Sequence, residues 1–291
     1  MANTLGSTSN GKAIAQRALT TLVDSLPFLT KAVTDFSDVP ARMNDTITTH
    51  LVTVGTASAY STTAGYVAAD RTQTDATISL SNLVHSTYAI TDAEKYTSSI
   101  DLINRFASSA AYALGKKMVD VMLDLVTASC YSSTLSVTAG ALTYRGVVSL
   151  GYGLDNNKVP SNDRYAIVSP DNKASLLNDA NIVANAQIQG EAVRSGSVGL
   201  VNGIEVFSYT ALPSAISKGF AAQKEALIVA ARVPEALDNY PGSQDVVTDP
   251  ESGLSLAVRE FVNPTLGTTN RSYILLFGCG RGSTSSLVRI V

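Results

Sequence analysis

The chain has 291 residues and a mass of 30.4 kDa, and 45% of its residues are hydrophobic, which excludes a disordered protein and allows one large or two small domains. Charged residues make up only 15%, against roughly 25% in ordinary soluble domains. The formal net charge of −3 excludes a strongly basic nucleic-acid binder. The sparse charge favours a protein that buries much of its surface against copies of itself.

Residues 1–42 begin with small polar residues and then place apolar residues at helical spacing as far as Leu26, just before Pro27. This pattern predicts an arm with one short amphipathic helix. Between residues 45 and 83, aliphatic residues alternate with threonines, which predicts two strands joined by a long excursion. Such a hairpin has too little apolar material to be stable alone, so we expect it to lie on another surface.

The strongest helical pattern follows this hairpin. Residues 91–94, Thr-Asp-Ala-Glu, predict a capping box. Apolar residues then repeat at alternating steps of three and four over residues 100–125, which predicts one continuous helix from about residue 98 to 129. Such a helix would be roughly 48 Å long. We therefore expect the fold to be built along it.

The second half of the chain alternates short helices and strands. The Asn202-Gly203 pair is a specific signal for a tight hairpin turn. The final 38 or so residues are rich in strand-forming residues separated by turn residues. The predicted elements are a helix at 144–156, a strand at 164–168, a short helix at 172–178, a hairpin at 197–208, one or two strands at 219–233, a loop at 241–253, and strands over 254–291 with turns at 263–264, 267–270 and 278–282.

No group of residues predicts catalysis, a metal site or a cofactor site. His50 and His85 lie in strand-like segments without partners at ligand spacing, so we expect structural roles. Phe277-Gly-Cys-Gly-Arg-Gly282 looks superficially like a phosphate-binding loop, but a strand follows it, which favours a turn. Asp120 and Asp124 share one face of the predicted helix beside a lysine, which favours solvated charges over paired catalytic carboxylates.

The ends and the cysteines indicate an intracellular protein. The first residues, MANTLGSTSN, lack the basic and apolar regions of a signal peptide, and no apolar run reaches the ~18 residues of a membrane span. We expect a soluble chain without membrane contact. Cys130 and Cys279 are too few for a disulfide framework, so we expect both thiols to be reduced and buried, with no lowered pKa at Cys130.

The order of these parts resembles that of the major capsid proteins of tailed bacteriophages, whose fold is shared with encapsulin shells. The resemblance covers nearly the whole chain. It implies an α+β fold with an N-terminal arm, an extended E-loop hairpin, a P domain with a long spine helix, and an A domain. The residues that carry it are Ile90-Thr-Asp-Ala-Glu-Lys95, Asp163-Arg-Tyr-Ala-Ile-Val-Ser-Pro170, Leu176-Leu-Asn-Asp179, Gly199-Leu-Val-Asn-Gly-Ile-Glu-Val-Phe207 and Leu212-Pro213.

The resemblance implies a structural subunit and not an enzyme. Its copies would form the hexamers and pentamers of an icosahedral capsid around double-stranded DNA, assembled in the host cytoplasm. The implied partners are other copies of the chain, scaffolding and portal proteins, with decoration proteins as a further candidate. The near-neutral arm suits DNA that a motor pumps in, so contacts with DNA should be weak. The implied divisions are an arm at 1–44, the E-loop at 45–90, the spine helix at 91–131, the A domain at 132–253, and C-terminal strands at 254–291 that return to the P domain.

Two sets of residues become candidates for assembly. The E-loop tip offers tyrosines, which suit a contact that is apolar on one side and wet on the other, and a charged pair that could form an ion pair across an interface. Gly115, in the middle of the predicted helix, costs about 1 kcal/mol relative to alanine and is the candidate hinge if the helix bends during shell maturation. The candidate interface residues are Gly55, Tyr60, Gly65, Tyr66, Val67, Asp70 and Arg71.

Three other functions compete with the phage capsid. An encapsulin-like compartment would need a docking surface for cargo peptides. A soluble α/β enzyme with a site lined by Ser and Thr would elute as a monomer or dimer. A phage tail or adhesion protein would show internal repeats, and the sequence has no visible repeat.

Overall fold

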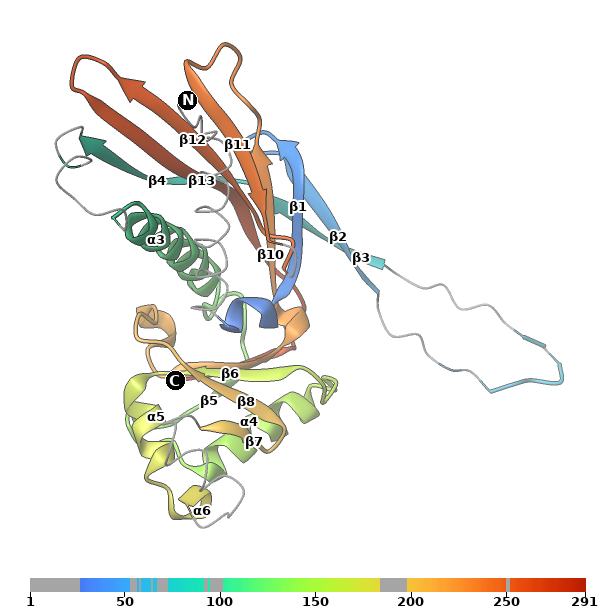
Figure 1. The fold of residues 1–291 in the computed structure, drawn as a ribbon. Coiled ribbons are helices and arrows are strands. Elements are labelled where there is room, and N and C mark those ends of the chain that lie inside the picture. Colours follow the sequence, from blue (N-terminus) through green and yellow to red (C-terminus); the bar gives the residue numbers. More distant parts are fainter. Residues whose placement is uncertain are drawn as a thin grey trace.

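The computed structural model describes residues 27–52, 57, 59–63, 65–66, 73–91, 94, 102–183, 198–249 and 252–291. The described elements form a unit around a larger sheet, a unit around a smaller sheet, and a hairpin that projects from the body (Figure 1). The helix predicted before Pro27 lies outside the described residues. The first described element is the short helix η1 (Pro27–Lys31).

The larger sheet has six strands, in the order β1-β10-β13-β12-β11, with β4 also paired to β13. β1 pairs with β10 in parallel, and the other neighbours are antiparallel. β13 has 14 residues and is buried in its middle, so it is the central strand. The strands are β1 (Val33–Ala41), β4 (Asn82–Thr91), β10 (Leu227–Pro234), β11 (Gly242–Thr248), β12 (Ser255–Asn263) and β13 (Thr268–Arg281).

Parts of this sheet differ from the sequence-based expectations. Residues 241–253, expected to be a loop, contain β11, a polar edge strand in which partner hydrogen bonding outweighs weak strand propensity. The expected turn at 278–282 is wrong, because β13 continues through Arg281 and pairs there with Leu227. β1 lies in the segment expected to be an arm. In place of the two turns expected at 263–264 and 267–270, the chain makes one turn over residues 264–267, and residues 268–270 already pair with β12 as the start of β13.

The long helix is present as α3 (Leu102–Asp124), whose 23 residues extend about 35 Å along one face of the larger sheet (Figure 1). The predicted capping box is confirmed. The backbone N–H of Thr91 donates to Glu94 Oε2 at 2.9 Å, and the N–H of Glu94 donates to Thr91 Oγ1 at 3.2 Å. The helix ends before residue 129, because the β-branched and hydroxyl residues that follow Asp124 favour other backbone conformations. Residues 98–101 lie outside the described part.

The smaller sheet also has six strands, in the order β5-β14-β9-β6-β8-β7. The predicted helix at 144–156 and strand at 164–168 are confirmed, and the predicted Asn-Gly turn has both residues in the left-handed region, at φ 49° for Asn202 and 75° for Gly203. The remaining elements are β5 (Thr134–Leu135), α4 (Tyr144–Asn156), β6 (Arg164–Val168), α5 (Pro170–Leu177), α6 (Ala180–Val183), β7 (Gly199–Val201), β8 (Ile204–Ser208), η2 (Ser214–Ile216), β9 (Gly219–Gln223), η3 (Lys224–Ala226) and β14 (Leu287–Ile290).

The projecting hairpin consists of β2 (Thr46–Val52) and β3 (Gln73–Ser79), paired in antiparallel register from Thr46↔Ser79 to Val52↔Gln73. This confirms the two strands joined by a long excursion. β4, also within the span 45–90, runs into the larger sheet instead.

One hydrophobic core joins the two sheet units. It combines Leu29 and Ala32 of the arm, the C-terminal half of α3, and buried side chains of both sheets, among them Phe220 and Phe277. Two polar contacts cross the same junction. Tyr209 donates its hydroxyl proton to Asp120 Oδ1 at 2.8 Å, and Lys31 Nζ lies 2.7 Å from Glu205 Oε2. The body should therefore behave as one rigid unit, and the hairpin is the part that extends from it.

Candidate assembly interface

The hairpin has little attachment to its own subunit. At its base, Ile78 and Leu80 are buried, whereas Asp75 and Thr77 further out are exposed. A two-stranded ribbon without a covered face is marginal in water. The described part of the hairpin therefore has few contacts with its own subunit beyond Ile78 and Leu80.

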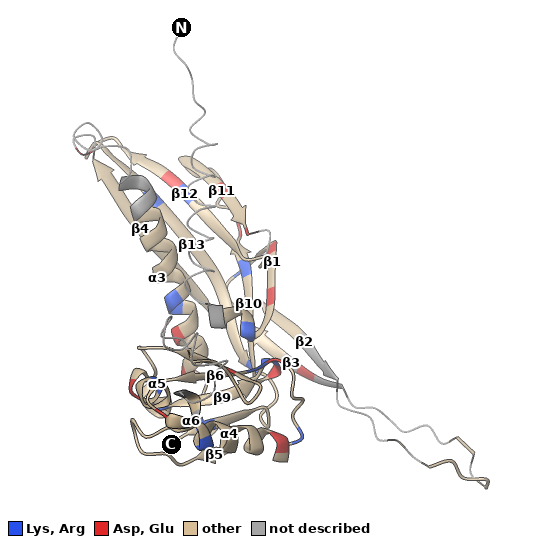
Figure 2. Cartoon of the chain, turned by 60° about the horizontal axis from the view of Figure 1, so that its bottom comes forward, with Lys and Arg blue, Asp and Glu red and all other residues tan. Residues whose placement is uncertain are grey.

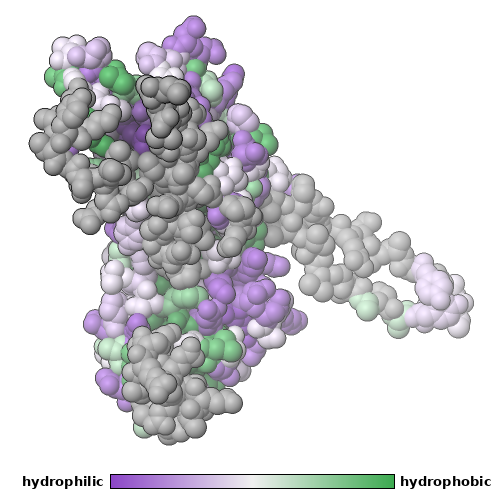
Figure 3. Space-filling view, viewed as in Figure 1, coloured by the Kyte–Doolittle hydropathy of each residue, from purple (hydrophilic) through white to green (hydrophobic). Residues whose placement is uncertain are grey.

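The described tip of the hairpin is a short turn that carries two tyrosines. The N–H of Gly65 donates to the carbonyl of Ser61 at 2.8 Å, and Gly65 has φ 65°, which favours glycine. The ring centroids of Tyr60 and Tyr66 lie 5.0 Å apart, and the two side chains are 61% and 94% exposed. In Figure 3 the tip is pale, of intermediate hydropathy.

Three of the interface residues predicted from the sequence lie in this turn. The structure brings Tyr60, Gly65 and Tyr66 together in one turn. Gly55, Val67, Asp70 and Arg71 lie outside the described residues.

The rest of the surface is also poor in charge and carries large apolar side chains. In Figure 2 the described Lys, Arg, Asp and Glu residues are scattered along the ribbon, without a long run of either colour. Exposed apolar residues lie on α3, on α4 and on outer strands and turns, a distribution typical of a subunit with several interfaces. The most exposed of these on the body are Val39, Met43, Tyr152, Leu200, Leu237, Val262 and Leu266.

Gly115 lies in the middle of α3, which is continuous on both sides of it. The residue is buried, on the same side of the helix as Leu114 and Met118.

The side chains considered for catalysis do not form a site. Asp120 lies 3.6 Å from Lys116 and accepts the hydroxyl proton of Tyr209, whereas Asp124 is exposed. Burial raises the pKa of the Tyr209 hydroxyl, and the hydrogen bond to Asp120 raises it further. His85 is exposed on β4, with its Nδ1 3.2 Å from Thr87 Oγ1.

Two kinds of feature are absent from the described residues. No three His, Cys, Asp or Glu side chains among them are placed to hold a metal ion. No helix in the described ranges is both long enough and apolar enough to cross a membrane. The side chain of His50 lies outside the described part.

The two cysteines differ from each other, contrary to expectation. Both thiols are free and half-buried. The pKa of the Cys130 thiol is lowered, chiefly by a hydrogen bond from the Thr127 side chain, with smaller contributions from Ser129 and Arg281. The expectation of an unperturbed thiol is wrong chiefly because the turn after α3 brings the Thr127 hydroxyl to it, and Arg281 of β13 adds a smaller effect. Burial raises the pKa of the Cys279 thiol to about 12.

This difference predicts selective labelling. Because the thiolate is the reactive form, iodoacetamide at neutral pH should alkylate Cys130 of the native, unassembled subunit and spare Cys279 until the chain unfolds. Peptide mass mapping over time measures both rates. Cys130→Ser should remove the fast reaction, and similar native rates at both thiols would contradict the assignment.

Comparison with known proteins identifies the fold. The sequence model of the phage capsid protein family matches residues 85–261, more than half of the chain. The capsid of Cyanophage P-SCSP1u has a similar structure (TM-score 0.61, 15% identity, 89% of this chain and 86% of that chain covered). So does the capsid of Helicobacter pylori bacteriophage KHP30 (TM-score 0.57, 8% identity, 88% and 86% covered).

A virus-like particle from Pyrococcus furiosus shares the fold as well (TM-score 0.51, 11% identity, 94% of this chain and 98% of that chain covered). No curated protein matches the chain. These comparisons confirm the α+β capsid fold and the resemblance on which the sequence-based assignment depended. The chain belongs to the phage capsid protein family, and it is a structural, self-assembling subunit of a viral capsid shell rather than an enzyme.

Proposed function

We propose that copies of this subunit form the hexamers and pentamers of an icosahedral shell that encloses double-stranded DNA. The observation that carries the proposal is the projecting hairpin, whose tip exposes 94% of Tyr66 while its base is buried in the body. A segment of this kind is stabilised only when a neighbouring copy covers it.

Each part of the fold receives a role in this proposal. The hairpin is the E-loop, the larger sheet with α3 is the P domain with its spine helix, and the unit around the smaller sheet is the A domain, which gathers around the capsomer axis. Support comes from the common core, which holds the body rigid while the hairpin projects from it. The tip, with Tyr60, Gly65 and Tyr66, would lie across a neighbouring subunit, and Asp70 and Arg71 would pair there.

The proposal also extends to partners. We expect scaffolding and portal proteins, with decoration proteins as a further candidate, and assembly in the host cytoplasm. Contacts with the packaged DNA should be weak, because the chain has a net charge of −3 and therefore no excess of the Lys and Arg side chains that bind phosphates.

The expressed protein itself tests the proposal. Negative-stain microscopy and sedimentation should find closed shells or ring-shaped capsomers, because the hairpin and the apolar surface residues need partners. A folded monomer that persists to high micromolar concentration would count decisively against it.

An encapsulin-like compartment is the second candidate, favoured by the likeness to the Pyrococcus furiosus virus-like particle over nearly the full length of both chains. The content of particles purified from the native source distinguishes the two. Nuclease-resistant double-stranded DNA supports the phage capsid, and a protein cargo without DNA supports the compartment.

We propose Gly115 as the hinge of the spine helix. Gly115→Ala should stabilise the helical conformation by about 1 kcal/mol and make the helix harder to bend. The expansion of immature shells should then be slower. Time-resolved light scattering after an expansion trigger measures the rate. Ala113→Gly, at an exposed position of the same helix, is the matched control and should lower helix stability instead. Expansion of the Gly115→Ala shell at the wild-type rate would leave close packing as the role of this glycine.

A further inference from the structure

Two glycines separated by one residue lie near the end of the central strand. They belong to the segment 277–282, whose sequence superficially resembles a phosphate-binding loop. Gly278 and Gly280 lie within β13, where residues two apart face the same side of the sheet. Neither is among the described glycines with positive φ. Glycine in a strand interior weakens the strand, so the backbone conformation of β13 does not account for them.

The close approach of the hairpin accounts for both. A Cβ atom added to Gly278 would overlap the carbonyl oxygen of Ser79 and lie 2.9 Å from Ile78 Cγ2. One added to Gly280 would lie 2.7 Å from Ile78 Cγ1. Non-bonded carbon atoms pack at about 3.5–4.0 Å. β3 can therefore cross so close to β13 only because Gly278 and Gly280 have no side chains. We call these two residues the glycine seat.

The seat lies where the hairpin is attached. Leu80 accepts a hydrogen bond from the N–H of Asn44 at 2.9 Å and donates its own N–H to the carbonyl of Asp45, also at 2.9 Å. Ile78 and Leu80 are buried in a cluster with Ile228, Ala230 and Leu276 of the larger sheet. Asp75, Thr77 and Ser79, on the opposite face of β3, are exposed, so among the described side chains the contacts that orient the hairpin are those of Ile78 and Leu80.

We infer that Gly278 and Gly280 are positioning residues for assembly: they fix the angle at which the hairpin leaves the body and thereby how it meets a second copy of the chain. A methyl group at Gly278 needs about 1 Å more room. Spread over the roughly 7 Å between residues 78 and 80, this tilts the hairpin by about 10°, and the far end of its seven-residue strands moves by about 4 Å. Interfaces packed like protein interiors do not absorb such a displacement.

The test compares shell size for substitutions of the seat in the full-length chain. This inference rests on the proposed role of the hairpin as a contact between subunits. Gly278→Ala should give shells of altered diameter, or open sheets, while the circular dichroism of the subunits stays native. Gly280→Ala should have a smaller effect, because the atom it meets belongs to a side chain. Negative-stain microscopy measures the diameters.

A double substitution separates the angle of the hairpin from general damage. Ile78→Ala removes the Cγ1 and Cδ1 atoms that a methyl group at Gly280 would meet, so the Gly280→Ala/Ile78→Ala double variant should assemble more like the wild type than either single variant does. Cys279 lies between the two glycines, and its Sγ is directed to the carbonyl of Met118 on α3. Cys279→Ala should give shells of wild-type size.

The outcomes are distinct. Wild-type shells from both glycine variants would overturn the inference. So would a Gly280→Ala variant that fails to fold and is not rescued by Ile78→Ala, because the seat would then serve only core packing. If a chain without the hairpin tip also forms normal shells, the interface role of the hairpin itself fails. If that chain fails to assemble while Gly278→Ala gives normal shells, only the role of the seat is refuted.

Discussion

Removing the tip of the hairpin should leave the subunit folded and prevent shell formation. The last strand pair before the tip is Val52↔Gln73, so replacing residues 53–72 with Asn-Gly joins β2 to β3 through a tight turn. The exposed tyrosines of the tip contribute nothing to the described core, so thermal unfolding of the subunit should hardly change. In a shell, each copy would lose the contact that its own tip makes with one neighbour and the contact that it receives from the tip of another. Sedimentation should therefore show subunits or capsomers in place of shells.

Substitutions in the tip show whether assembly needs its aromatic side chains or only the presence of the loop. Tyr60→Ala/Tyr66→Ala should weaken assembly by about 2 kcal/mol per contact, or about 30-fold in the association constant. Tyr60→Phe/Tyr66→Phe, the matched control, keeps the paired rings and should assemble nearly normally.

Hydrogen exchange supplies a test that does not depend on variants. Residues 55–75 should exchange rapidly in free subunits and slowly in shells, because a neighbouring copy covers them only after assembly. Equal protection in both states would mean that the tip packs on its own chain, and its interface role would be wrong.

The parts of the fold that local sequence signals determine were predictable. The capping box at Thr91, the helix at 144–156 and the Asn202-Gly203 turn depend on contacts between residues that are near in sequence, and all three are confirmed. The tyrosines of the hairpin tip were also predictable, because an uncharged stretch too poor in apolar residues to form a core must be exposed or covered by a partner.

The sequence-based predictions that were wrong concern elements that depend on contacts between distant parts of the chain. β1 exists because Val33 pairs with Ile228, and β11 because its backbone pairs with β12; neither segment has the periodicity of a strand. The glycines of β13 indicated a turn because nothing in the local sequence reveals that β3 crosses above them. Cys130 is a different case, because its pKa is lowered chiefly by nearby Thr127 and only to a smaller extent by distant Arg281.

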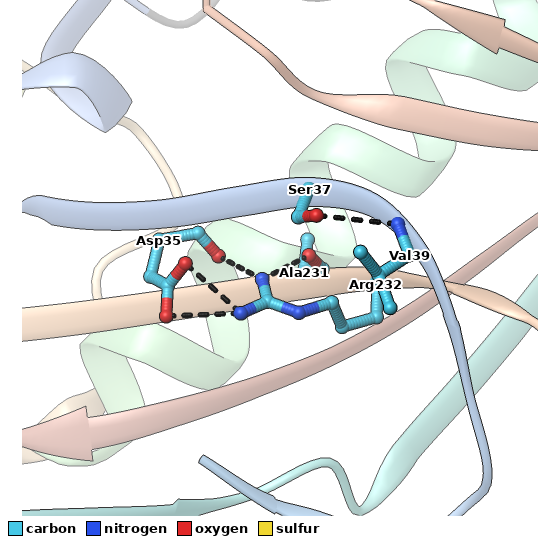
Figure 4. Close-up of polar contacts among 5 residues, drawn as sticks. All are labelled: Asp35, Ser37, Val39, Ala231 and Arg232. Carbon is cyan, nitrogen blue, oxygen red and sulfur yellow. Dashed lines mark hydrogen bonds and ion pairs between the residues drawn. The ribbon is translucent and has the colours of Figure 1, made fainter. Parts of the chain in front are cut away.

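Figure 4 shows an arginine that binds β1 close to an irregularity in its pairing with β10. The register between β1 and β10 shifts between Phe36 and Pro40, where Ser37 Oγ accepts the N–H of Val39 at 3.2 Å. The guanidinium of Arg232 lies beside this irregularity. Its Nη1 donates to the carbonyls of Asp35 at 2.7 Å and Ala231 at 2.9 Å, and its Nη2 donates to both carboxylate oxygens of Asp35 at 3.0 Å. The side chain thus satisfies acceptors that regular strand pairing would otherwise satisfy.

Arg232→Ala should destabilise the unassembled subunit by about 2–3 kcal/mol, since it leaves a carboxylate and two carbonyl groups without their charged donor. Arg232→Lys should recover only part of this loss, because an ammonium group cannot reproduce the planar fork. The midpoint of urea denaturation measures the change. Arg42→Ala is the matched control: the Arg42 pair with Glu235 is exposed and screened by solvent, so its loss should hardly move the midpoint.

The consequences should extend from β1 to the junction of the body. Leu29 and Ala32, just before β1, are buried in the core that both sheets and α3 share. Release of β1 therefore withdraws apolar contacts from the junction as well as hydrogen bonds from the sheet edge. Amide exchange in Arg232→Ala should increase first at residues 33–36 and then at the C-terminal half of α3. A variant whose denaturation midpoint and exchange both match those of Arg42→Ala would show that pairing with β10 holds β1 without the arginine.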